Sequence, residues 1–85
     1  PYRLEISPKA KRDLRKVPRA DFGKIDQAIL SLENNPRPFG IKKLQDRLHR
    51  IRIGDWRVLF AIYDSEKWIS IVAVKRRSEK TYRSF

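Results

Sequence analysis

Residues 47–63 read RLHRIRIGDWRVLFAIY, and they carry the clearest secondary-structure signal in the chain. Its two halves, residues 47–53 and 56–63, are rich in Ile, Val, Trp and Phe, and their apolar side chains recur at every second position. The glycine and aspartate at residues 54–55 are typical of a two-residue hairpin loop. The stretch therefore predicts two antiparallel strands joined by a tight turn.

A two-residue loop fixes which residues face each other across this hairpin. It pairs Ile53 with Trp56 and Arg52 with Arg57. Because side chains alternate along a strand, one face of the hairpin is apolar and is expected to cover the helices. That face carries Ile51, Ile53, Trp56, Val58, Phe60 and Ile62. The opposite face carries Leu48, Arg50, Arg52, Arg57, Leu59, Ala61 and Tyr63.

Two helices are expected before the hairpin. Ser7 and Pro8 are typical of a helix start, with a capping hydroxyl followed by proline at the first helical position. Pro18 ends this helix and begins a second one, whose apolar residues follow the helical period. These are Phe22, Ile25, Ala28, Ile29 and Leu32. Two prolines and a glycine then make residues 36–40 a loop.

Further strands are expected at residues 2–6 and 67–74, where apolar side chains also alternate. The element order is then β-α-α-β-β-β. Two consecutive helices followed by a meander of strands predict an α+β fold, with the helices packed on one face of a small, mostly antiparallel sheet. The whole chain, residues 1–85, is expected to form one domain.

Composition restricts the class of protein. The chain carries 21 Lys and Arg against 10 Asp and Glu, a formal charge of +11, which favours a polyanionic partner: nucleic acid, an acidic protein or a membrane surface. A charge that serves only solubility is the simpler alternative, although acidic residues would serve as well. With no cysteine and one histidine, we expect no disulfide and no metal site, and a reducing cytoplasm suits the chain. No apolar run approaches the roughly 20 residues of a membrane span, and residues 1–6 have no apolar signal core.

Three arginines converge on the polar face of the hairpin. Arg52 and Arg57 stand directly opposite each other, with Arg50 two residues along, and like charges so placed destabilise a sheet. A bound phosphate explains the arrangement, because one guanidinium group can donate two hydrogen bonds to phosphate oxygens. The same groups stabilise charge that develops on a phosphorane. A solvated face whose long stems cover Leu48 and Leu59 is the simpler alternative.

The tail and the aromatic residues allow more than one interpretation. The tail carries Lys75, Arg76, Arg77, Lys80 and Arg83 around Tyr82. This pattern suits single-stranded RNA, whose bases stack on exposed rings, although a disordered basic tail fits it equally well. His49 points to the apolar face, so we expect it at the edge of the core and not as a general base, despite its pKa. Trp56 is expected in the core, whereas Trp68 fits either the core or base stacking.

Three motifs resemble the RelE family of bacterial and archaeal toxins. Residues 50–58, RIRIGDWRV, resemble the family's YRIRVGDYRV stretch. Residues 35–44, NPRPFGIKKL, resemble its NPRPxGxKKL loop, and residues 73–82, AVKRRSEKTY, resemble its closing VxRRxExxY. The similarity runs from the first strand to Tyr82, in matching element order.

The resemblance implies the toxin of a type II toxin–antitoxin system. Such toxins are endoribonucleases that enter the ribosomal A site and cut mRNA there without a metal or another cofactor. The ribose 2′-hydroxyl attacks its own 3′ phosphate, which leaves a 2′,3′-cyclic phosphate and a 5′-hydroxyl. The implied partners are the ribosome with its rRNA, the mRNA and a cognate RelB-type antitoxin. We expect a monomer when the toxin is free and a higher-order complex with the antitoxin.

The family's motif also implies site residues. The catalytic candidates are Arg52, Arg57, Arg76 and Tyr82, and the RNA-binding candidates are Arg50, Lys75, Arg77, Lys80 and Arg83. By this resemblance, Arg57 stabilises the transition-state phosphate, Arg76 or Arg77 serves the leaving oxygen, and Tyr82 orients a base. Arg52 stands where many members have a lysine proposed as general base. Because arginine is a poor proton acceptor, we expect it to act electrostatically while solvent or the ribosome takes the proton.

Two other functions are compatible with the same fold. ParE-like toxins share it and inhibit DNA gyrase by binding, without cleaving RNA. As a group they generally lack this set of arginines and the tail tyrosine. A plain RNA- or DNA-binding module is the third alternative, although a simple binding surface would spread its charges more widely than Arg52 and Arg57 do.

Overall fold

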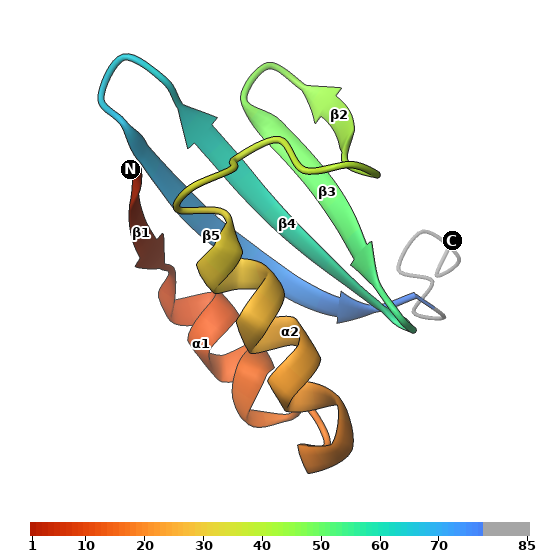
Figure 1. Ribbon diagram of the computed structural model, residues 1–85. Coiled ribbons are helices and arrows are strands. Elements are labelled where there is room, and N and C mark those ends of the chain that lie inside the picture. The colour runs from red at the N-terminus through yellow and green to blue at the C-terminus, as the bar shows by residue number, and fades with distance from the viewer. Residues whose placement is uncertain (78–85) are drawn as a thin grey trace, which may run out of the picture.

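The computed structural model describes residues 1–77, which form two helices and a five-stranded sheet (Figure 1). In chain order the elements are β1 (Arg3–Ile6), α1 (Pro8–Arg15), α2 (Arg19–Ser31), β2 (Lys42–Gln45), β3 (Leu48–Ile53), β4 (Trp56–Tyr63) and β5 (Trp68–Arg76). The strand order is β1-β5-β4-β3-β2, with β1 parallel to β5 and the other neighbours antiparallel. Both helices cover the same face of the sheet, and we call the face that neither helix covers the open face. The predicted α+β architecture is confirmed.

Signals at the helix ends explain where each helix begins and stops. The Ser7 hydroxyl accepts a hydrogen bond from the Ala10 amide at 3.0 Å, and Pro8 occupies the first turn, where its missing N–H is not needed. Pro18 stands as the N-cap of α2. The predicted helix start and the predicted break are therefore confirmed. Among the described residues, no helix combines the length and the apolar character needed to span a bilayer.

The strand β2 is the element that the sequence pattern did not predict. Its four residues are all exposed and show no apolar alternation. It forms by antiparallel pairing with β3 at the edge of the sheet, with Lys42 opposite Arg50 and Lys43 opposite His49. The predicted order β-α-α-β-β-β is therefore wrong by one strand, because a polar edge strand lacks the buried face that would mark it.

The β3–β4 hairpin has the predicted register. Ile53 pairs with Trp56, and Arg52 pairs with Arg57. Gly54 adopts a φ of +58°, in the left-handed region that favours glycine, and this residue lets the chain reverse between the two strands. The predicted division of the hairpin into an apolar face and an arginine-bearing face is therefore confirmed.

The core lies between the helices and the sheet. Its largest fully buried side chains come from α2 with its C-cap and from β4 and β5: Ile25, Ile29, Leu32, Val58, Phe60, Ile62, Ile69 and Ile71. Ile51 and Ile53 pack against this cluster and are partly buried. The core therefore fixes which face of the hairpin turns away from the helices.

A bulge in β5 changes the face on which its last side chains lie. The pairing of β5 with β4 shifts by one residue between the partners of Leu59 and Phe60, which leaves Val72 as an extra residue. A one-residue shift moves every later side chain to the other face of the sheet. Lys75 consequently lies on the open face, and Arg76 lies on the helix side.

Candidate functional site

A row of cationic side chains crosses the open face near the β3–β4 turn. Arg52, Arg57 and Lys75 occupy paired positions on β3, β4 and β5, and Arg50 lies two residues before Arg52. At the edge of the sheet, Lys42 of β2 pairs with Arg50. We call these five residues the cation row. Because neighbouring strands lie about 4.8 Å apart, the row spans about 14 Å from β5 to β2.

The pKa of Arg50 reflects the repulsion among these charges. It is lowered, first because the side chain is partly removed from water, and then because Arg52, Arg57 and Arg77 repel its charge. Within residues 1–77, no carboxylate forms an ion pair with Arg50 or Arg52. Arg50 nevertheless stays protonated near neutral pH, as arginines do. A bound anion would relieve this repulsion.

Arg57 is tied to the end of β5. Its Nη2 donates to the carbonyl oxygens of Arg76 and Arg77, each at 3.4 Å. The side chain is half-buried, whereas that of Arg52 on the neighbouring strand is exposed. The backbone at the end of β5 therefore helps to orient the Arg57 guanidinium, and Arg52 has more freedom to follow a ligand.

Arg76 and Arg77, between which the sequence did not decide for the role at the leaving oxygen, lie on different sides of the sheet. Arg76 pairs with Trp56, and its guanidinium carbon lies 4.6 Å from the centroid of the Trp56 ring. Arg77 instead lies close enough to Arg50 to lower its pKa, and its amide donates to the Asp55 carbonyl oxygen at 2.6 Å. Arg77 therefore belongs with the cation row, and Arg76 does not.

The structure thus gathers part of the predicted site. Arg50, Arg52, Arg57, Lys75 and Arg77 lie together. Lys80, Tyr82 and Arg83 lie outside the described residues, so their roles stay predictions. Lys42 was not predicted as a site residue, because it lies beside Arg50 only through the pairing of β2 with β3.

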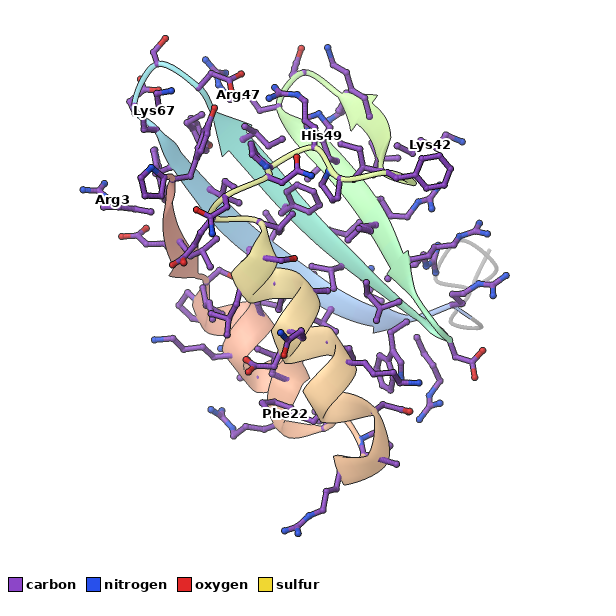
Figure 2. All side chains as sticks on the ribbon, viewed as in Figure 1. Arg3, Phe22, Lys42, Arg47, His49 and Lys67 are labelled. Carbon is purple, nitrogen blue, oxygen red and sulfur yellow. The ribbon has the colours of Figure 1, made fainter. Side chains whose placement is uncertain are left out.

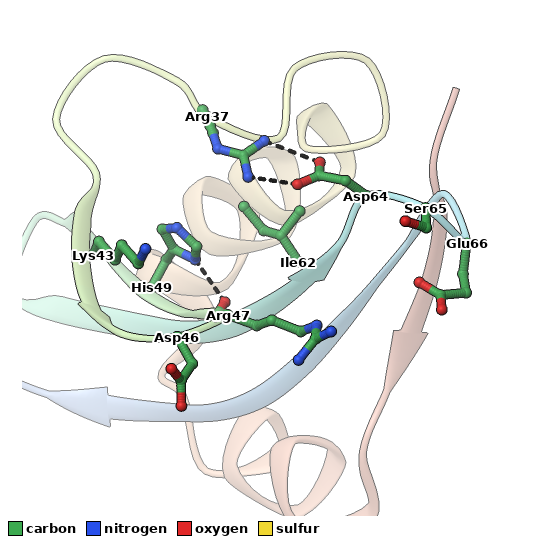
Figure 3. Close-up of a pocket in the computed structure, with 9 residues that line it drawn as sticks. All are labelled: Arg37, Lys43, Asp46, Arg47, His49, Ile62, Asp64, Ser65 and Glu66. Carbon is green, nitrogen blue, oxygen red and sulfur yellow. Dashed lines mark hydrogen bonds and ion pairs between the residues drawn. The ribbon is translucent and has the colours of Figure 1, made fainter.

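His49 occupies the edge of the core, as predicted. It is 5% exposed, it stacks on Phe60 with ring centroids 5.8 Å apart, and its Nδ1 lies 2.7 Å from the Arg47 carbonyl oxygen (Figure 3). A carbonyl only accepts, so Nδ1 carries the proton of this hydrogen bond. Because His49 lies on the helix side of β3, it is not placed to exchange protons with a ligand on the cation row.

The two tryptophans have separate surroundings. Trp56 is buried, and its Nε1 donates to Asp21 Oδ2 at 3.0 Å. Trp68 stacks on Tyr63, with ring centroids 4.8 Å apart, and the Arg47 guanidinium carbon lies 5.1 Å from the centroid of the Tyr63 ring. The prediction for Trp56 is confirmed, and Trp68 lies on the open face, remote from the cation row along the strands.

A pocket of about 370 Å³ lies near the β4–β5 turn, beneath the loop that precedes β2 (Figure 3). Asp64 binds Arg37 through two contacts, Nη1–Oδ1 at 3.1 Å and Nη2–Oδ2 at 2.8 Å, and accepts from the Tyr2 hydroxyl at 2.7 Å. The hydrogen bonds from Arg37 and then Tyr2 lower the pKa of Asp64 to about 2. Cationic and acidic side chains both line this pocket, so it suits a polyanion less well than the cation row.

The cation row can bind a phosphodiester and stabilise added negative charge on it. Guanidinium groups supply paired donors to phosphate oxygens and remain charged throughout. They do not accept a proton at working pH, so the arginines of the row do not supply a general base. Within residues 1–77, no group of three or more His, Asp or Glu side chains is arranged to hold a metal ion.

The family model and the relatives that match this sequence all carry the names of toxins. The sequence matches the family described as ParE toxin of type II toxin–antitoxin system, parDE, over residues 4–81. It is 32% identical to a protein named RelE1 from Methanocaldococcus jannaschii, over 98% of this chain and 97% of that protein. It is 33% identical to Toxin RelE of Mycobacterium tuberculosis, over 92% of this chain and 84% of that protein.

Solved structures have the same fold. A chain of the archaeal RelE–RelB complex from Pyrococcus horikoshii superposes with a TM-score of 0.83 at 28% identity, over 93% of this chain and 98% of that chain. A chain of the RelBE2 complex from Mycobacterium tuberculosis gives 0.79 at 26% identity, over 91% and 99%. The isolated E. coli RelE toxin gives 0.80 at 14% identity, over 99% and 93%, a likeness that shows the fold alone.

Proposed function

Since this chain belongs to the ParE toxin family of type II toxin–antitoxin systems, within the RelE/ParE superfamily, we propose that it is a toxin that cleaves mRNA in the ribosomal A site. The observation that supports this proposal is the pairing of Arg52 with Arg57 on the open face, in a row with Arg50 and Lys75. Like charges placed side by side weaken a sheet, and a phosphodiester bound between them offsets that cost.

In the proposed reaction, the ribose 2′-hydroxyl attacks the adjacent phosphorus and the bond from phosphorus to the 5′ oxygen breaks. The products are a 2′,3′-cyclic phosphate and a 5′-hydroxyl. The 2′ proton leaves to solvent or to the ribosome, because the arginines are already protonated. Arg57, oriented by the end of β5, stabilises the charge that grows on the non-bridging oxygens, and Arg52 adds to the same field.

In this proposal Arg77, and not Arg76, neutralises the charge on the leaving 5′ oxygen, which takes a proton from solvent to become the 5′-hydroxyl. Arg77 shares the open face with the other arginines, whereas Arg76 is engaged with Trp56 on the helix side. Arg50 and Lys75 bind flanking phosphates in this proposal. The roles predicted for Lys80, Tyr82 and Arg83 are kept as proposals, with Tyr82 stacking on a substrate base.

The partner proposed for neutralisation is a RelB-type antitoxin. Two of the similar solved structures are complexes of RelE with RelB. A strongly cationic toxin surface favours a partner of opposite charge, and electrostatic attraction speeds such an association. An antitoxin that covers the cation row would also block RNA from it.

Inhibition of DNA gyrase is the second candidate function. The family match carries the name of the ParE toxins, and this match favours the alternative. The cation row favours RNA cleavage over it, because binding alone does not require paired guanidinium groups. The two functions differ in their target, so each can be assayed without the other.

Two parallel assays on the wild-type protein test the proposal. Primer extension on an mRNA in a reconstituted translation system is expected to show cuts within A-site codons, absent when ribosomes are omitted. Supercoiling by DNA gyrase is expected to proceed normally at the same toxin concentration. Intact mRNA together with blocked supercoiling would reject the nuclease in favour of the gyrase inhibitor.

A further inference from the structure

The loop between α2 and β2 presents an unusually exposed aromatic ring. Phe39 is fully exposed, with a relative accessibility of 104%. The Ile41 amide donates to the Pro38 carbonyl oxygen at 3.3 Å, which closes a turn with Phe39 and Gly40 at its two central positions. Gly40 has a φ of +94°, as the third residue of a type II turn requires. Phe39 therefore stands at the tip of a defined turn.

The base of this loop is fastened to the sheet. Arg37 makes two contacts with Asp64 in the β4–β5 turn, at 3.1 and 2.8 Å (Figure 3). Proline at residues 36 and 38 also restricts the backbone on either side of Arg37. The loop consequently pays little further conformational entropy when the Phe39 ring meets a ligand.

The tip lies beside the β2 end of the cation row. Phe39 precedes Lys42 by three residues, so their Cα atoms are within about 11 Å of each other. Lys42 projects outward at the edge of the sheet (Figure 2) and pairs with Arg50. Between residues 33 and 46 the sequence has three cationic residues and no carboxylate. One of them, Arg37, is paired with Asp64, so the attraction for a polyanion comes from Lys42 and Lys43. The surroundings of Phe39 therefore attract a polyanion.

We propose that Phe39 is a base-stacking subsite for single-stranded RNA whose phosphates follow the cation row toward β2. Each base has a flat face that stacks on an aromatic ring, and backbone charge beside the ring keeps the base in reach. The proposal rests on the proposed RNA-cleaving function and adds a contact on the β2 side of the scissile phosphate. Phe39 is a binding residue and not a catalytic one.

The test is the affinity of the full-length protein for a single-stranded oligoribonucleotide that is 2′-O-methylated throughout and so cannot be cleaved. Fluorescence anisotropy compares wild type with Phe39→Ala and Phe39→Trp. The matched control is Phe22→Ala, since Phe22 is also exposed, at 40%, but lies on α2, far from Lys42 (Figure 2). Loss of one stacked base is expected to weaken binding about 5- to 150-fold in Phe39→Ala. Phe39→Trp and Phe22→Ala are expected to bind like wild type.

The dependence of affinity on salt separates stacking from charge. Phe39→Ala is expected to keep the wild-type slope, whereas Lys42→Ala is expected to lower it by about 0.7, the value for one phosphate contact on a single strand. Wild-type affinity in Phe39→Ala, with weaker binding by Arg52→Ala, overturns the subsite and leaves the RNA site standing. Equal affinity for all variants, Arg52→Ala included, or no binding by wild type, overturns the RNA site and the subsite together. Unchanged RNA affinity with a weakened antitoxin complex in Phe39→Ala assigns the loop tip to a protein contact instead.

Discussion

Replacing Arg77 by alanine is expected to slow RNA cleavage strongly, whereas replacing Arg76 is expected to leave it close to the wild-type rate. Arg77 lies near enough to Arg50 to lower its pKa, and Arg76 lies on the other side of the sheet, against Trp56. Removing one positioned donor from a developing oxyanion costs about 10²–10³ in rate. The Arg77→Ala variant is therefore expected to lose cleavage by about that factor.

The expected effect of Arg76→Ala is on stability. The guanidinium carbon of Arg76 lies 4.6 Å from the centroid of the Trp56 ring, and Arg76 is exposed. At exposed sites such cation–π contacts contribute about 0.5–1 kcal/mol to stability. For a domain of this size, that loss corresponds to a decrease in Tm of about 2–8 °C. Cleavage per folded molecule is expected to stay within about twofold of wild type, because the lost contact lies away from the phosphate site.

Single-turnover cleavage on ribosomes that carry a programmed mRNA measures both effects, with thermal unfolding of each variant as the control. Arg77→Lys is expected to recover part of the rate, since it restores charge without the paired donors. Slow cleavage by Arg76→Ala with normal cleavage by Arg77→Ala would refute the assignment that follows from the bulge in β5. Equal losses in the two variants would show that total charge matters more than the face of the sheet.

Two further predictions concern the fold. Ile29 is 2% exposed, so Ile29→Ala is expected to lower the free energy of unfolding by about 2–5 kcal/mol. Leu30 is half-exposed, so the control Leu30→Ala is expected to lower it by far less. Urea denaturation measures both, and a loss below about 1 kcal/mol for Ile29→Ala would mean that α2 does not pack as described. The pKa of Asp64 is about 2 when folded against an ordinary value of 3.8, so the carboxylate stabilises the fold above pH 4 and loses that contribution as the pH falls toward 2. Asp64→Asn is expected to have a lower free energy of unfolding than wild type at pH 7 and about the same value near pH 2. Urea denaturation at both pH values measures this, and a difference that is the same at the two pH values would contradict it.

The hairpin could be predicted from the sequence because its signals are local. The loop at residues 54–55 and the alternation on both sides set one register, and that register placed Arg52 opposite Arg57. The helix boundaries at Ser7 and Pro18 also depend on adjacent residues alone. His49 could be assigned to the core edge by the same alternation.

The rest of the site depends on pairing that no local pattern shows. Uninterrupted alternation from Trp68 would place Arg76 on the open face, and the bulge near Val72 reverses this and puts Lys75 and Arg77 there. The strand β2 is polar throughout, so Lys42 had no sequence signal.

The contacts that fasten the loop before β2 also could not be predicted from the sequence. Asp64 lies 62 positions from Tyr2 and 27 from Arg37 in the sequence, and only the assembled sheet brings the three together. Without that contact, Phe39 would have been one exposed aromatic residue in a flexible loop.

Whether the arginines of the open face carry out RNA cleavage can be decided by comparing two proteins in one assay. Wild-type protein and Arg57→Ala are added to a reconstituted translation system, and primer extension maps the cuts in the mRNA, with thermal unfolding used to verify that the variant is folded. We predict cuts within A-site codons for wild type and a loss of those cuts in folded Arg57→Ala. Cleavage by folded Arg57→Ala at the wild-type rate would show that Arg57 has no role in the reaction.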